Sequence, residues 1–128
     1  MSTRDSSQPE TRAAWDAVMQ FRPDVFVDVH SWHSSGDGFW GPDPAAESPA
    51  IAALKNAIAR YFKIQHWDHE VMPFASAPTV AKRLNIAATL PEFALSFDSD
   101  GRLKTPDSMR RQGVAVLCGT YEYVRSLH

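Results

Sequence analysis

The segment from Asp24 to His30 constrains the fold more than any other part of the chain. A proline precedes it, and its valines alternate with Phe26 and Asp28, so that apolar residues occur on both sides of the run. Alternating β-branched and aromatic residues predict a strand, and apolar residues on both faces predict a central strand in a sheet that is covered on two sides. We therefore expect a layered domain with a histidine at the carboxyl end of a central strand.

A second apolar run, Ile86 to Leu95, predicts another strand and contains an isolated acid, Glu92. Pro91 has no N–H for a sheet hydrogen bond, so we expect an end or a bulge there. Helices are predicted from Ser7 to about Phe21, from Ser48 to about Phe62, from Thr79 to Leu84 and from Thr105 onward, mainly from capping residues, early prolines and apolar spacing. Strands that alternate with helices predict an α/β fold, a layered α/β/α domain with a mixed, mostly parallel sheet.

The composition excludes several classes of protein. The 128 residues are 44% hydrophobic and 22% charged, which is typical of one globular domain, with residues 1–6 expected to be disordered. A net charge of −2 gives no reason to expect nucleic acid or a membrane as a partner. Residues 1–8 are polar and lack the apolar core of a signal peptide, so a cytoplasmic location is expected.

Two further expectations concern packing. The last helix is predicted to point Met109, Val116, Leu117, Tyr121 and Val124 inward, with Cys118 as a buried filler rather than a nucleophile. Residues 31–48 contain too many glycines and prolines for a regular element. Within them, Ser34 to Gly38 is interpreted as a flexible cleft loop, and two tryptophans on either side of it, Trp32 and Trp40, are interpreted as pocket walls.

His30 and Glu92 are the candidates for chemistry. A histidine at the carboxyl end of a strand lies where open α/β sheets bind their ligands, and neutral imidazole binds zinc. Glu92 has apolar neighbours, and the resulting desolvation would raise its pKa toward the range of a general base. Asp28 shares a face with His30 and either orients the ring or faces a helix terminus. The structural alternatives are a hydrogen-bonded histidine at the rim of the core and a strand-end glutamate turned to water.

The segment Asp28-Val-His30-Ser31-Trp32, after a proline-initiated strand, resembles the part of carboxypeptidase A-type zinc peptidases that contains their third zinc ligand. Three other segments resemble this family in the same order: Ser7 to Ala13, Ala88 to Glu92, and Gly101 to Gly113. Together these segments span nearly all of the chain, but they correspond to less than half of the family's catalytic domain, its C-terminal part.

The resemblance implies a partial carboxypeptidase-like domain and a zinc-dependent metallocarboxypeptidase activity, in which zinc-activated water hydrolyses a C-terminal peptide or amide bond. It implies that His30 is a zinc ligand and that Glu92 is the general base and later the acid that protonates the leaving amine. Ser31 and Trp32 would line the substrate cleft. Carboxypeptidase A itself is a known example of a catalytic zinc held by two histidines and a glutamate.

The chain also departs from the family pattern. The family's first two ligands form a His-x-x-Glu motif, and no histidine precedes His30 in this sequence. The Asn-Arg pair that binds the substrate carboxylate belongs to the same absent half, and Pro91 lengthens the step from Thr89 to Glu92 by one residue. We therefore expect weak zinc binding by this chain alone, with full activity requiring the missing N-terminal half on the same chain or from a partner.

Other interpretations remain open. His33, and His66 with His69 beside Glu70, offer further imidazoles, although a solvated polar patch explains the second group more simply. The chain could also be a non-catalytic α/β binding module that descends from the peptidases. A third interpretation is an unstable gene fragment, whose half-sheet would leave unpaired strand edges.

Overall fold

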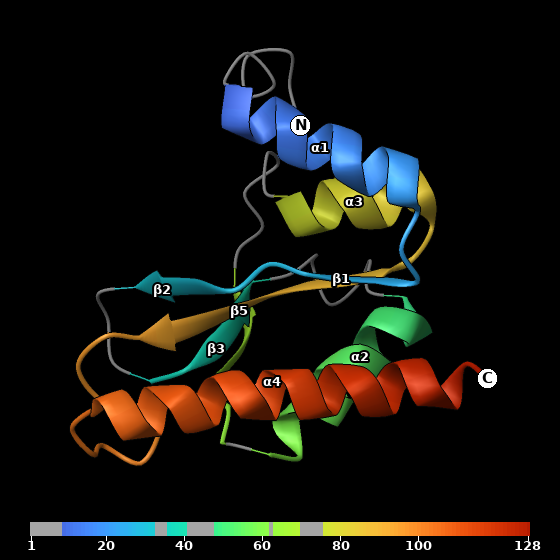
Figure 1. The fold of residues 1–128 in the computed structure, drawn as a ribbon. Coiled ribbons are helices and arrows are strands. Elements are labelled where there is room, and N and C mark those ends of the chain that lie inside the picture. Colours follow the sequence, from blue (N-terminus) through green and yellow to red (C-terminus); the bar gives the residue numbers. More distant parts are fainter. Residues whose placement is uncertain (1–8, 33–35, 41–47, 62, 70–75) are drawn as a thin grey trace.

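The computed structural model describes residues 9–32, 36–40, 48–61, 63–69 and 76–128. Its elements, in chain order, are α1 (Pro9–Phe21), β1 (Val25–Val27), β2 (His30–Trp32), β3 (Gly38–Trp40), α2 (Pro49–Ala59), β4 (His66–His69), α3 (Ser76–Leu84), β5 (Ala87–Ala94) and α4 (Pro106–Ser126). The sheet lies between two helical layers, with α1 and α3 over one face and α2 and α4 over the other (Figure 1). The predicted α/β/α layering is confirmed.

The centre of the sheet is β5. It pairs in parallel with β1 and β2 on one side and antiparallel with β3 on the other, and β3 pairs in parallel with β4. Every residue of β5 is buried, whereas the three residues of β1 are only half-buried. The mixed, mostly parallel sheet is as predicted, but the prediction of a central strand at Asp24 to His30 was wrong. That segment lies at the end of the described strand order.

Pro91 explains why the predicted strand from Asp24 to His30 is divided into β1 and β2. The Asp28 N–H donates to the Thr89 carbonyl over 3.0 Å. A parallel ladder would return a hydrogen bond from residue 91 to the Asp28 carbonyl, and proline has no N–H to donate. Pairing is resumed at His30, opposite Glu92. Pro91 therefore interrupts the ladder from inside the central strand, where the sequence had predicted an end or a bulge of the strand itself.

Local sequence signals set the helix starts. The Ser48 hydroxyl accepts from the Ile51 N–H over 3.2 Å, and Thr105 forms a reciprocal capping box with Ser108. Both predicted starts are confirmed, while the predicted cap Ser7 lies outside the described residues. Two bounds differ from the prediction, because α2 ends at Ala59 and α3 begins at Ser76.

The buried face of α4 agrees with the prediction at Val116 and, in part, at Val124, and differs from it at the other three positions. Of the predicted inward residues, Leu117 is 70% and Tyr121 is 65% exposed, and Met109 is also exposed. The buried positions are Gln112, Ala115, Val116, Gly119 and Tyr123. A Cβ at Gly119 would overlap the backbone of Ala57 and Ile58 in α2. The helix is thus oriented by the close approach that small residues allow, and this outweighs the larger apolar residues. Cys118 is half-buried.

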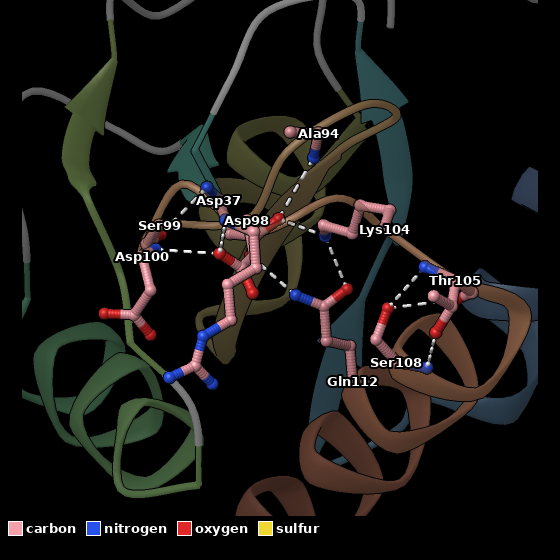
Figure 2. A network of polar contacts seen from close by, with 10 residues as sticks. Asp37, Ala94, Asp98, Ser99, Asp100, Lys104, Thr105, Ser108 and Gln112 are labelled. Atoms are coloured by element: carbon pink, nitrogen blue, oxygen red, sulfur yellow. Dashed lines mark hydrogen bonds and ion pairs between the residues drawn. The ribbon is translucent and has the colours of Figure 1, made fainter.

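A buried polar network holds the loop that precedes β3. The Asp37 carboxylate accepts hydrogen bonds from Lys104 Nζ at 2.6 Å, from the Ala94 N–H at 3.0 Å and from Gln112 Nε2 at 2.5 Å (Figure 2). Lys104 also donates to Gln112 over 2.6 Å. The prediction of a structureless segment from 31 to 48 was wrong, because β2 and β3 both form there. Gly36 to Gly38 is buried, and Asp37 lines a cavity of about 250 Å³, while the rest of the predicted cleft loop lies outside the described residues.

The two helical layers differ in how closely they cover the sheet. Phe39, Leu54 and Ile58 are fully buried in the core beneath α2 and α4. The core beneath α1 and α3 is smaller and includes Ala77, Ala88 and Leu90. No residue of α1 is buried. Among the described helices, none is both long enough and apolar enough to cross a membrane.

Candidate functional site

The structure brings the two predicted residues of the site together. His30 at the start of β2 lies directly opposite Glu92 in the parallel ladder with β5. The His30 Nδ1 atom is 3.7 Å from Glu92 Oε1, an ion-pair distance rather than a hydrogen bond. Glu92 shares its sheet face with Ala88 and Leu90, so the pair lies on the side covered by α1 and α3.

Asp28 completes a row of three side chains. Its Oδ1 atom is 3.1 Å from His30 Nε2, on the far side of the ring from Glu92. A carboxylate at this distance can accept a hydrogen bond from the Nε2–H of the ring and so hold its orientation. Of the two roles that the sequence left open for Asp28, the geometry favours orientation of the ring.

Glu92 is the most desolvated member of the row. It is 7% exposed, and its Oε2 atom is buried without a hydrogen-bond partner among the described residues. Burial raises the pKa of Glu92, the charge of His30 partly opposes this, and the charge of Asp28 adds to it. A carboxylate with a raised pKa takes up and releases a proton more readily near neutral pH, as general acid–base chemistry requires.

The remaining predicted site residues are less well placed. Ser31 is exposed in β2, beside His30. The side chains of Trp32 and Trp40 lie outside the described part of the structure, as do residues His33 and Glu70. His66 and His69 lie in β4, not in a helix, and their side chains lie outside the described part of the structure.

The residues fit part of a zinc centre but not all of one. An imidazole and a neighbouring buried carboxylate are the right kinds of group, and the unpartnered Oε2 atom of Glu92 is consistent with a site that has room for a further polar partner. A catalytic zinc needs about three protein ligands. The described residues contain no group of three or more His, Cys, Asp or Glu side chains that could hold a metal ion. The described residues therefore provide too few ligands for a complete catalytic zinc site.

No sequence pattern predicted the Asp37–Lys104–Gln112 network. Asp37 is flanked by glycines, which predicted a loop, and it precedes Lys104 by 67 residues and Gln112 by 75 residues. The side chains of Asp37 and Lys104 are almost completely buried. Lys104 Nζ also lies 5.4 Å from the centre of the Phe93 ring, so the network belongs to the side of β5 opposite Glu92. Because its polar groups form hydrogen bonds with one another, we infer that the network stabilises the fold.

Comparisons with known proteins add to this geometry. No family model matches the chain, and neither does any curated protein. Among solved structures, a metallo-carboxypeptidase from Burkholderia cenocepacia superposes with a TM-score of 0.73 at 15% identity, covering 94% of this chain and 35% of that one. The chain has a metallocarboxypeptidase-like fold. A Burkholderia mallei protein, provisionally designated a carboxypeptidase, superposes with a TM-score of 0.69 at 16% identity, covering 93% and 35% of the two chains.

The predicted resemblance is thus confirmed at the level of the fold. This chain spans about a third of each solved structure, since the covered share is 35% in both. The name of the first neighbour implies a metal there.

Proposed function

We propose that this chain supplies one metal ligand and the general base of a zinc-dependent hydrolase of the metallocarboxypeptidase type, acting on a C-terminal peptide or amide bond. The observation that carries the proposal is the juxtaposition of His30 and Glu92 across one register pair, at 3.7 Å. Support also comes from the metallocarboxypeptidase-like fold.

Each residue of the row has a distinct role in the proposal. Asp28 holds the proton of the His30 ring on Nε2, so that Nδ1 provides the ligand lone pair on the Glu92 side. The Glu92 carboxylate accepts a proton from water and later donates it to the departing amine, because burial raises its pKa. Zinc, when bound, would act as a Lewis acid and make a nucleophile available at neutral pH. Ser31, exposed beside His30, would contact the substrate together with Trp32.

The remaining ligands would come from a further segment of a longer chain or from a partner. The β1–β2 segment lies at the end of the described strand order, and His30 is about half exposed on it. A further element could therefore approach His30 along this side of the sheet. The proposed partners are this completing segment and a peptide or amide substrate.

Zinc titration by calorimetry tests the ligand role. We expect weak one-to-one binding that is lost in His30→Ala and retained in His128→Ala, a matched control at an exposed histidine. Binding that survives His30→Ala would contradict the proposal. Tight binding that His30→Ala abolishes would instead require additional ligands from residues outside the described ranges.

Hydrolysis of an N-acylated dipeptide, by the chain combined with its completing segment and zinc, tests the base. Glu92→Gln should lower the rate by about 10²–10⁴-fold while leaving zinc binding intact, since a neutral amide cannot accept the proton. Glu122→Gln, at a glutamate of α4 that bonds Arg60, serves as the matched control and should leave the rate unchanged. Equal rates in wild type and Glu92→Gln would refute the assignment of Glu92.

One observation favours a second candidate, a non-catalytic binding module with the same fold. The described residues offer no complete group of metal ligands. This candidate predicts no zinc-dependent hydrolysis, and a thermal melt that zinc does not shift.

A further inference from the structure

A cavity of about 240 Å³ lies between α1, α3 and the end of β1. Its walls include Ala14, Trp15 and Val18 from α1, together with Phe26 and Val80. Asp28 is the only charged side chain among the described residues that line it. The space is therefore apolar along most of its surface and has a carboxylate at one place. It is large enough for a substituted benzene, since a cavity of about 150 Å³ in another protein binds benzene.

The cavity exists because α1 does not pack closely against the sheet. None of the thirteen residues of α1 is buried, although Trp15 and Val18 face the sheet side. A helix that leaves its largest apolar side chains half-exposed over a space of this size has not closed against the strand beneath it. The space is partly open to solvent, and an apolar hollow beside a fixed polar group is the usual composition of a small-molecule site.

Two charged groups near the cavity would orient a ligand that carries a charge. The Asp28 carboxylate is held by the His30 ring at 3.1 Å and is 29% exposed. The Arg83 guanidinium lies 5.9 Å from the centre of the Trp15 ring. A cationic end of a ligand would be attracted by Asp28 and repelled by Arg83, and an apolar end would pack against Trp15.

We propose that this cavity binds a small ligand with an aromatic or branched aliphatic body and a protonated amine, with the body between α1 and β1 and the amine at Asp28. Binding requires no metal and no hydrolysis, so this inference stands or falls separately from the proposed function. The ligand class follows from the apolar walls, the volume and the single lining carboxylate.

Titration with benzylamine, followed by backbone and indole NMR resonances, tests the proposal on the metal-free protein. Benzylamine should shift resonances of Trp15, Val18 and Val80. Benzyl alcohol, which lacks the charge, should bind about tenfold more weakly, and methylamine, which lacks the ring, should produce no saturable shift. Equal responses to benzylamine and methylamine, or no response of these residues to benzylamine, would overturn the proposal.

Two alanines of α1 provide a matched pair of variants. Ala14 lines the cavity, and Ala17 on the same helix does not. Ala14→Leu should weaken benzylamine binding by about tenfold or more by filling the space, while Ala17→Leu should leave it unchanged; leucine preserves helix propensity in both. Equal binding by the two variants would place the ligand elsewhere.

Asp28→Asn tests the polar end. It should remove the roughly tenfold preference for benzylamine over benzyl alcohol and leave benzyl alcohol binding unchanged. A preference that persists in a folded Asp28→Asn protein would overturn the role of Asp28. If this variant does not fold, the comparison of the three probes on the wild-type protein decides the question.

Discussion

The two faces of the sheet differ in whether their polar side chains have hydrogen-bond partners. Beneath α2 and α4, Asp37 and Lys104 are almost completely buried and satisfy each other together with Gln112. Beneath α1 and α3, His30 is half-exposed, and Glu92 has a buried oxygen without a partner among the described residues. A closed network stabilises one arrangement of the chain, whereas an open and incompletely satisfied row remains available for a ligand or a proton.

The largest expected effect on stability is on the closed face. Lys104→Ala should lower the free energy of unfolding by about 3–5 kcal/mol, because the Asp37 carboxylate would remain buried without its countercharge. The control is Lys63→Ala, which removes an exposed ion pair with Asp100 and should change the same quantity by at most about 1 kcal/mol. Urea denaturation measures both, and equal losses would mean that the buried network has no special role.

A smaller effect tests the close packing of that face. Gly119→Ala should destabilise the protein by about 1–3 kcal/mol, because its methyl group would overlap the backbone of Ala57 and Ile58. In the same helix, a Cβ at Gly113 meets no atom within 4 Å, so Gly113→Ala should stabilise by about 0.5–1 kcal/mol. Thermal melts should therefore move in opposite directions. Movement in the same direction would show that α4 does not approach α2 as described.

The smallest effect concerns the open face. Burial raises the pKa of Glu92, so the folded protein holds this proton more tightly than the unfolded chain does. Ionisation of Glu92 therefore lowers stability as the pH rises above the ordinary pKa of a glutamate. Glu92→Gln should stabilise the protein by about 1 kcal/mol near neutral pH, and this gain should shrink in acid as the wild-type carboxyl becomes protonated.

At Glu122, the same substitution of glutamate by glutamine should change stability with pH in the opposite direction. Its pKa is lowered by the Tyr61 hydroxyl and by Arg60, so its contribution to stability is present above the ordinary glutamate pKa and is lost as the pH falls. Urea denaturation across the acid range should give Glu92→Gln and Glu122→Gln opposite pH dependences. A gain for Glu92→Gln that does not change with pH would argue against a buried, proton-binding carboxyl.

Features that depend on a few neighbouring residues were predictable. The caps at Ser48 and Thr105 act within one turn, so their sequence is sufficient to place the helix starts. The buried acid in an apolar run, Glu92, and the strand-end histidine, His30, were also predictable as candidates. Their register across the sheet was not, because it depends on which strands pair.

Features that depend on contacts between distant segments were mispredicted. The sequence alone predicted that the large residues Leu117 and Tyr121 face inward, whereas the close approach at Gly119 orients α4 differently. The glycines around Asp37 predicted an open loop, because the partners that bury it, Lys104 and Gln112, come much later in the chain.

The sequence alone determined that this protein is a layered α/β domain whose helices begin at defined caps. It also indicated His30 and Glu92 as candidate site residues. Only the tertiary structure decided that β5 is the central strand, that Pro91 divides the neighbouring strand, and that His30 lies opposite Glu92 with Asp28 on the far side of its ring. The reason is physical. Propensities and caps act over a few residues, whereas strand pairing and burial are set by segments that meet only when the whole chain has folded.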